Sequence, residues 1–167
     1  MKQISRMAAL LVLVACSAEA AGPRPLHTVV DGLPAGLNVQ FSVTPATVKQ
    51  NQSFDALLEI TNESGAAVTI TTGHGCLAVP NVMRGNASVP VQGSRWGCTA
   101  AITNHTFAPG ETREIRWPMK ATLYADEPGA EDGAPLPPGT YSVQAEFDVY
   151  VPGSNRKPVV EAPFIVE

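Results

Sequence analysis

The sequence has few of the features that nucleic-acid binding or catalysis requires. Its 167 residues include 11 Lys and Arg against 15 Asp and Glu, and the basic residues form no cluster that could contact a phosphate backbone. His27, His74 and His105 are the three histidines that could act as a base, and no serine lies in a Gly-x-Ser-x-Gly motif. We therefore expect a non-enzymatic protein that uses no cofactor and binds no nucleic acid.

The sequence also has no apolar run long enough to span a membrane as a helix, which needs about 20 residues. Its longest uncharged apolar segment near the amino terminus, Met7 to Ala15, follows the basic residues Lys2 and Arg6. This arrangement is typical of a secretory signal peptide, so the sequence predicts export. Removing Lys2 and Arg6 from the 11 basic residues leaves 9 against 15 acidic ones, a net charge of −6.

The end of this apolar segment, Leu13-Val14-Ala15-Cys16, resembles the lipobox of bacterial lipoproteins. The resemblance implies cleavage before Cys16 and acylation of its sulfur and its new amino group. Several acyl chains anchor a protein stably, at about 0.8 kcal/mol per buried methylene. Ser17, rather than an aspartate, follows the cysteine, which favours the outer membrane and a domain that faces the periplasm or the surface. Cleavage by an ordinary signal peptidase after Ala18-Glu19-Ala20 is the alternative.

Cysteine is scarce, and its count agrees with lipidation. The chain has three cysteines, an odd number that would leave one unpaired in an oxidising compartment. If Cys16 carries lipid, Cys76 and Cys98 remain, and we expect them to form a structural disulfide. This bridge would close a loop of a little over twenty residues and stabilise the domain by roughly 3 kcal/mol in the chain-entropy model.

The chain after the signal peptide (residues 1–15) divides into a tether and a domain. Residues 16–36 start at the lipidated cysteine, are rich in Ala, Gly and Pro, and show no sustained apolar periodicity. This composition is typical of a flexible linker. Apolar and polar residues alternate from Leu37 onward, so we predict a folded domain over residues 37–167.

Alternation with a period of two predicts β-strands along this domain. It is clearest in Leu37–Val43 and Tyr141–Val149, and further strands are predicted at 54–61, 67–72, 112–117 and 158–166. About seven short strands, separated by turn sequences and without a helical period, indicate an all-β fold. We predict an immunoglobulin-like antiparallel β-sandwich.

The sequence also predicts how some strands are arranged. The segments 54–61 and 67–72 flank a short polar turn, which predicts a hairpin. Between Gly73 and His105, short apolar pieces are interrupted by prolines such as Pro80 and Pro90. Because proline restricts a strand to a sheet edge, we expect edge strands and loops there, held together by the Cys76–Cys98 bridge.

Three segments resemble domains of the BsuPI-type intracellular proteinase inhibitor family. They are Leu58-Glu59-Ile60-Thr61-Asn62-Glu63-Ser64-Gly65, Phe107-Ala108-Pro109-Gly110-Glu111-Thr112 and Leu136-Pro137-Pro138-Gly139-Thr140-Tyr141. Their order and spacing match over about Phe41 to Phe147. The resemblance implies an immunoglobulin-like domain that binds a protein, in the founding case a serine proteinase. Each segment also has a structural reason to recur, because Asn, Gly and Pro-Gly shape turns before and after strands.

Two features depart from that family. Its namesake is cytoplasmic, whereas this chain has an export signal, and the Cys76–Cys98 pair is not part of the family pattern. No residue can be assigned as an inhibitory contact. Our leading hypothesis is a lipid-anchored binding domain whose partner is a protein, either a proteinase that it binds or inhibits or a component of the envelope. The alternative is a structural or assembly protein of the cell envelope.

A third hypothesis is a periplasmic metal-binding protein. Two histidines and two cysteines, His74, Cys76, Cys98 and His105, could form a tetrahedral zinc site, and His74 with His105 could bind copper. The His74-x-Cys76 spacing is tighter than in the usual zinc knuckle, and export favours a disulfide over free thiolates. We therefore expect the disulfide rather than a metal site.

An acidic, proline-rich stretch is the first candidate for a contact surface. It contains Asp126, Glu127, Glu131 and Asp132, which lack the ligand spacing of a calcium loop. Long loops without secondary structure are often functional.

The predicted signal peptide and lipidation site can be tested by measuring the mass of the mature protein. The intact mass of protein extracted from membranes should correspond to loss of residues 1–15 and addition of acyl groups at Cys16, with two fewer hydrogens for the Cys76–Cys98 bridge. The variant Cys16→Ser should lose the acyl mass and leave the membrane fraction, because the anchor depends on the thiol. An unacylated wild-type protein that starts at residue 21 would instead indicate the ordinary signal peptidase.

Overall fold

The structure is a computed structural model that describes residues 30–124, 133–149 and 157–167. The predicted signal peptide, Cys16 and the acidic residues Asp126, Glu127, Glu131 and Asp132 lie outside the described residues. No helix of the described residues is long and apolar enough to cross a membrane.

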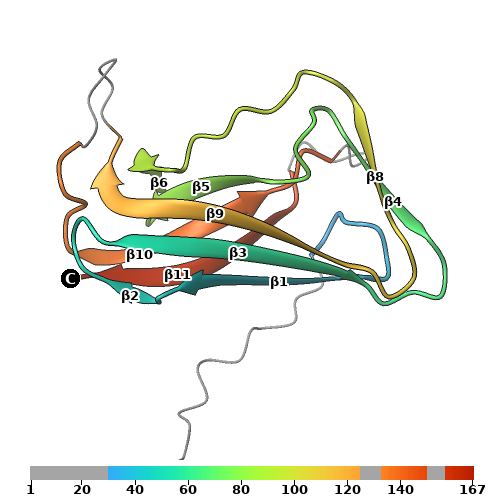
Figure 1. The fold of residues 1–167 in the computed structure, drawn as a ribbon, viewed down its shortest axis with the longest axis horizontal. Helices are drawn as coiled ribbons and strands as arrows, with labels where there is room; N and C mark the ends of the chain where they lie inside the picture. The colour runs from blue at the N-terminus through green and yellow to red at the C-terminus, as the bar shows by residue number, and fades with distance from the viewer. Residues whose placement is uncertain (1–29, 125–132, 150–156) are drawn as a thin grey trace, which may run out of the picture.

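Eleven strands form among the described residues, most of them paired in two sheets that face each other (Figure 1). They are β1 (Leu37–Thr44), β2 (Thr47–Val48), β3 (Ser53–Asn62), β4 (Val68–Thr72), β5 (Val79–Arg84), β6 (Ala87–Ser88), β7 (Val91–Gln92), β8 (Thr103–Phe107), β9 (Thr112–Leu123), β10 (Gly139–Glu146) and β11 (Val159–Val166). One sheet has the order β1-β3-β9-β7, and the other has the order β2-β11-β10-β5-β6. A third, two-stranded sheet consists of β4 and β8.

The core lies between the two larger sheets and follows the alternation of the sequence. Every second residue of β1, β3 and β11 is buried, and so are Tyr141, Val143 and Ala145 of β10. Phe54 of β3 and Phe164 of β11 meet across the two layers, with ring centroids 4.8 Å apart. Burying a large apolar side chain contributes about 1.5–3 kcal/mol, so this interface is the main source of stability.

The predicted fold class is confirmed: the described residues form an all-β sandwich of immunoglobulin-like build, antiparallel apart from the short strand β2, which runs parallel to β11. Six of the strands, β1, β3, β4, β9, β10 and β11, lie on ranges that the sequence predicted, and β5 lies in the region where edge strands were expected. The others are the two-residue strands β2, β6 and β7, and β8, whose sequence Thr-Asn-His-Thr-Phe holds a single apolar residue. Such a polar strand shows no apolar alternation, which is why it was not predicted.

The predicted hairpin between 54–61 and 67–72 is wrong. β3 pairs with β1 on one side and with β9 on the other, so both of its edges are occupied before β4 begins. β4 pairs instead with β8, from Val68 opposite Phe107 to Thr72 opposite Thr103. The β3–β9 ladder therefore continues, after a bend, as the β4–β8 ladder. Figure 1 shows this pair, which we call the bent ribbon, turning away from the end of the sandwich.

Asn62 holds the bend together. It is fully buried, and its side-chain amide donates to the carbonyls of Ala66, Phe107 and Ala108 at 2.8–3.1 Å. Its Oδ1 accepts hydrogen bonds from the backbone and the hydroxyl of Ser64. One side chain thus connects the turn that leads into β4 with the end of β8, at the point where the chain changes direction. Two of the segments that resemble the inhibitor family meet here.

The third of those segments forms a corner at the start of β10. The hydroxyl of Tyr141 donates to the carbonyl of Pro137, four residues upstream, at 2.7 Å. Its ring is buried and stacks on Phe164 at 5.5 Å. A tyrosine whose hydroxyl bonds back to the preceding turn is a recurrent feature of immunoglobulin-like sandwiches, and it anchors β10 against β11.

The region between Gly73 and His105 contains short strands at sheet edges, as predicted. β6 covers β5 only at Met83 and Arg84, so β5 has an open edge at Pro80. Pro80 pairs with Ala145 on its other side, and an open edge is where a residue without an N–H group is tolerated.

The folded unit also includes the end of the predicted tether. Val30 is buried, and Leu33 packs against the core. Val30 additionally accepts a hydrogen bond from the backbone of Leu33. These contacts place residues 30–36 against the sandwich, next to the bent ribbon.

Replacement of Asn62 by alanine should destabilise the domain strongly. The change removes five hydrogen bonds at the bend, each worth about 0.5–1.5 kcal/mol net. The carbonyls of Ala66 and Ala108 keep their bonds from Ser64 and Glu111. We expect the free energy of unfolding, measured in urea, to fall by about 3 kcal/mol or more. Asn104→Ala is the matched control, because Asn104 is exposed and accepts one bond from Thr71; its cost should stay within about 1 kcal/mol. Equal losses in the two variants would contradict this role for Asn62.

Candidate functional site

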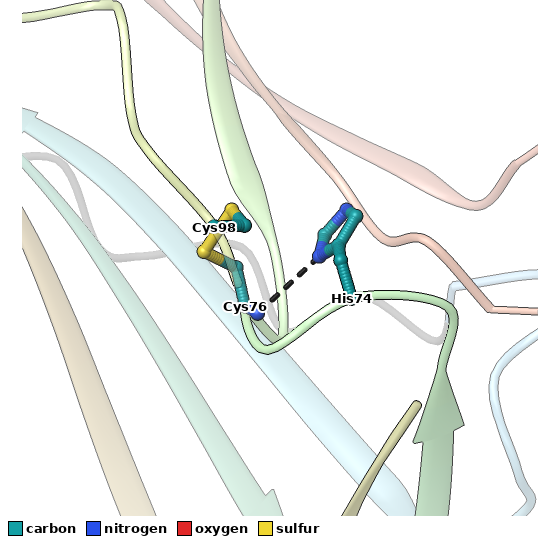
Figure 2. A group of neighbouring side chains, drawn as sticks. All are labelled: His74, Cys76 and Cys98. Atoms are coloured by element: carbon teal, nitrogen blue, oxygen red, sulfur yellow. Dashed lines mark hydrogen bonds between the residues drawn. A yellow bond between two sulfur atoms is a disulfide. The ribbon is translucent and has the colours of Figure 1, made fainter. Parts of the chain in front are cut away.

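The loops at the far end of the bent ribbon bring a histidine next to a disulfide. β4 ends at Thr72 and leads through His74 to Cys76, while Cys98 lies on the segment that returns toward β8. The two cysteines form a disulfide with a Cα–Cα distance of 5.4 Å, within the usual range for such bridges. The predicted pairing of Cys76 with Cys98 is therefore confirmed. Figure 2 shows the imidazole of His74 beside the bridge.

Both ring nitrogens of His74 have a neighbour. Nδ1 lies 3.3 Å from the backbone nitrogen of Cys76, which donates to it. Nε2 lies 3.4 Å from Oδ2 of Asp148, just beyond the end of β10. The ring is half-buried between these two groups. The carboxylate next to Nε2 favours a proton on that nitrogen and leaves the lone pair on Nδ1.

Asp148 belongs to a small charge cluster. Lys157 lies 2.9 Å from its Oδ1 and 2.8 Å from Oε1 of Glu146. The hydrogen bond from Lys157 holds the pKa of the Asp148 carboxyl below its usual range, and the bond to Glu146 raises the pKa of Lys157. Asp148 therefore faces His74 as a carboxylate at neutral pH.

His105 lies on β8 and contacts a different partner. The hydroxyl of buried Thr72 donates to the carbonyl of His74 at 2.5 Å and lies 3.2 Å from Nε2 of His105. Because the hydroxyl proton is used, His105 donates from Nε2 to the hydroxyl oxygen. Burial lowers the pKa of His105, with further contributions from Arg113 and His74.

Two glycines allow the loops to pack this closely. A Cβ atom at Gly75 would lie 2.1 Å from the hydroxyl of Thr99, and a Cβ atom at Gly73 would lie 2.7 Å from a carboxylate oxygen of Asp148. The backbone N–H of Gly75 also donates to the carbonyl of Thr99 at 2.8 Å. A Cβ atom at either position would force the Thr99 hydroxyl or the Asp148 carboxylate to move from its present place.

An open groove lies beside β4, next to this cluster. Its volume is about 560 Å³, within the range of small-molecule sites. Four consecutive residues of β4, Thr69 to Thr72, form one wall of the groove. Because neighbouring residues of a strand point to opposite faces, a wall made of consecutive residues follows the edge of the strand. The remaining lining residues come from three other segments: Gly32, Leu33, Pro34, Gly73, Ile102 and Val149.

The structure separates the four residues proposed as metal ligands. In the described part of the chain, the donor atoms that gather within 4.8 Å of one another belong to His74, Cys76 and Cys98. His105 faces Thr72 instead, and the pairing of His74 with His105 as a copper site stays a prediction. The sequence does not single out Asp148 or Lys157, because Asp148 occupies one of the polar positions in the alternating segment Tyr141–Val149. The acidic loop proposed as a contact surface lies outside the described residues.

The lowered pKa of His105 predicts a specific pH dependence. The folded domain binds a proton at His105 less tightly than the unfolded chain, whose pKa is near 6.5. Neutral His105 therefore stabilises the fold fully above pH 6.5. This contribution to the free energy of unfolding should disappear as the pH falls through the pKa of His105 in the folded domain. An NMR titration of the His105 ring should give a midpoint below that of the same ring in concentrated urea. His105→Gln should remove this component of the pH dependence, and a folded midpoint at or above 6.5 would contradict it.

No family model matches this chain, and no curated protein matches it. Solved structures with partial similarity include an alkylpurine DNA glycosylase from Pseudomonas fluorescens, at 12% identity and a TM-score of 0.42 over 81% of this chain and 32% of that one. A β-glucosidase from Erythrobacter marinus matches at 10% identity and a TM-score of 0.44, over 78% of this chain and 15% of that one.

A CARDB domain from Pyrococcus furiosus matches at 15% identity and a TM-score of 0.35, over 81% of this chain and 90% of that domain. The chain thus spans less than a third of the glycosylase and a smaller part of the glucosidase. Similarities at this level carry no conclusion about what this chain binds or does.

Proposed function

We propose that this chain is an exported, lipid-anchored, non-enzymatic domain that binds an extended segment of a protein partner in the groove beside β4. The lipobox-like Leu13-Val14-Ala15-Cys16 supports the anchor, with the outer membrane as the favoured location. The observation that carries the binding proposal is the groove itself, which lies along a strand whose outer edge has no partner strand among the described residues.

The edge of β4 suits the addition of a further strand. β4 pairs with β8 on one side only, and on its other side a single bridge joins Thr72 to Val149 at the end of the strand. Unpaired backbone groups on a strand edge are a ready template for an extended peptide, which gains main-chain hydrogen bonds there. Because the bent ribbon has left the sandwich, neither larger sheet covers this edge.

The side chains of the groove indicate the chemistry of the partner. None of its ten lining residues is charged. Leu33, Pro34 and Val149 present apolar surface on one side, and Ile102, which is 81% exposed, stands at the rim. Together with these residues, the exposed isoleucine extends the apolar surface that a partner would cover. The groove therefore favours an uncharged, extended segment with apolar side chains.

The resemblance to BsuPI-type inhibitors suggests which partners to test first. It implies a protein ligand, and in the founding case that ligand is a serine proteinase. A proteinase held by one of its own surface segments would fit the groove, and inhibition would follow if the bound segment borders the active site. An envelope protein held in the same way would fit the assembly alternative.

Ile102→Glu should remove partner binding without affecting the fold. The side chain is exposed, so the substitution costs little stability, whereas a carboxylate at the rim disfavours an apolar segment. Against a panel of serine proteinases and of extended apolar decapeptides, we expect any ligand of the wild-type domain to bind the variant at least about tenfold more weakly. Fluorescence anisotropy measures both affinities.

Ile165→Glu is the matched control, since Ile165 is 47% exposed on β11 and does not line the groove. It should bind like the wild type. A ligand that is equally weakened by both substitutions, or by neither, would contradict the groove as the binding site. A flat response to every proteinase, with peptide binding retained, would remove the inhibitor version alone.

A further inference from the structure

We propose that reduction of the Cys76–Cys98 disulfide converts this corner into a site for a thiophilic metal ion, Cu(I) or Zn²⁺, bound by His74 and both cysteine thiolates. This inference is independent of the groove, because it rests on the loops beyond the end of β4. It also differs from the four-residue site considered from the sequence, since His105 takes no part.

The three donor atoms are already close together. One ring nitrogen of His74 and the sulfurs of Cys76 and Cys98 lie within 4.8 Å of one another, and all three residues are half-buried (Figure 2). Thiolates and imidazole are the ligands that zinc and Cu(I) prefer. Zinc–sulfur distances of about 2.3 Å would place the two sulfurs roughly 3.8 Å apart in a tetrahedral site.

The surroundings of His74 orient it as a ligand. Its Nε2 faces the carboxylate of Asp148 at 3.4 Å, and its Nδ1 points toward the cysteine loop, where it accepts the N–H of Cys76. Metal-bound histidines usually donate their second N–H to a carboxylate, which sets the ring orientation and increases the basicity of the ligating nitrogen. Lys157 in turn holds Asp148 in place. A metal ion would take over the Nδ1 lone pair from the Cys76 N–H group.

Contacts other than the disulfide keep the two cysteine segments together. The N–H of Gly75 donates to the carbonyl of Thr99, so the residues next to Cys76 and Cys98 are joined by a backbone hydrogen bond. The hydroxyl of Thr72 holds the carbonyl of His74 from the other side. Opening the sulfur–sulfur bond therefore leaves the two thiols facing the same imidazole.

The chemistry balances with a dithiol as the reductant. The dithiol transfers two electrons and two protons, becomes a disulfide itself, and leaves thiols at Cys76 and Cys98. The metal ion then displaces both thiol protons, since thiolates are the ligating form. Three protein donors suit the low coordination number of Cu(I), and Zn²⁺ would complete its four ligands with one water.

Metal titration of the reduced domain tests this proposal. The protein is reduced with a water-soluble phosphine, freed of it without oxygen, and shown to carry two thiols by a colorimetric thiol assay. Titration with Cu(I), and separately with Zn²⁺, against a chromophoric chelator should then give one bound ion per chain. The oxidised protein should bind neither ion at this site, and the bound ion should protect both thiols from alkylation.

Substitutions distinguish a metal site that includes His74 from metal binding by the two cysteine thiolates alone. His74→Ala should weaken binding of the ion at least about tenfold, and Asp148→Asn should weaken it about 10- to 100-fold, as second-layer partners of metal-bound histidines do. His105→Ala is the matched control and should bind like the wild type, because His105 faces Thr72. Circular dichroism of each reduced variant establishes that the sandwich is intact.

Three results would overturn the proposal. The reduced wild-type domain could lose its fold, its metal affinity could be unchanged in His74→Ala, or His105→Ala could weaken binding as much as His74→Ala does. Neither the groove nor its peptide ligands enter these measurements, so failure here is distinguishable from failure of the proposed function.

Discussion

The buried side chain of Asn62 is the contact on which the arrangement of the candidate sites depends. With five hydrogen bonds it joins the end of β3, the turn after it and the segment between β8 and β9. A buried amide is stable only when its donors and acceptors are satisfied, and here the partners include the carbonyls of Ala66, just before β4, and of Phe107, at the end of β8. These bonds stabilise the bend, which directs β4 and β8 away from the sandwich.

This bend creates both features that could act in function. Since the ribbon leaves the two larger sheets, one edge of β4 stays open along the groove, and the loops beyond β4 and before β8 close on each other through the disulfide. Thr72 connects the two features: it lines the groove, and its hydroxyl bonds the carbonyl of His74. A ligand in the groove and a change at the disulfide would thus act on the same strand end. The sandwich serves as a rigid support for both.

The fold could be predicted well because alternation is a local property. In β1, β3, β10 and β11 every second side chain enters the core, and such a pattern needs no knowledge of the partner strand. The pairing of β4 could not be predicted in this way. A polar turn between two strands favours a hairpin, yet the edges of β3 were already taken by β1 and β9, and β8 is too polar to be recognised. For the candidate site, cysteine counting predicted the disulfide, whereas Asp148 looked like any polar residue on a strand's outer face.

The sequence by itself determined the class of fold, the buried face of each long strand and the pairing of Cys76 with Cys98, because these follow from side-chain period and from the count of reactive groups. Only the tertiary structure decided which strands are neighbours, where the ribbon bends, and that His74 lies between a disulfide and a carboxylate. Asn62 bonds to Phe107, 45 residues further along the chain, and His74 meets Asp148 across an even longer stretch. Contacts of that kind depend on how the sheets pack, and no local pattern encodes them.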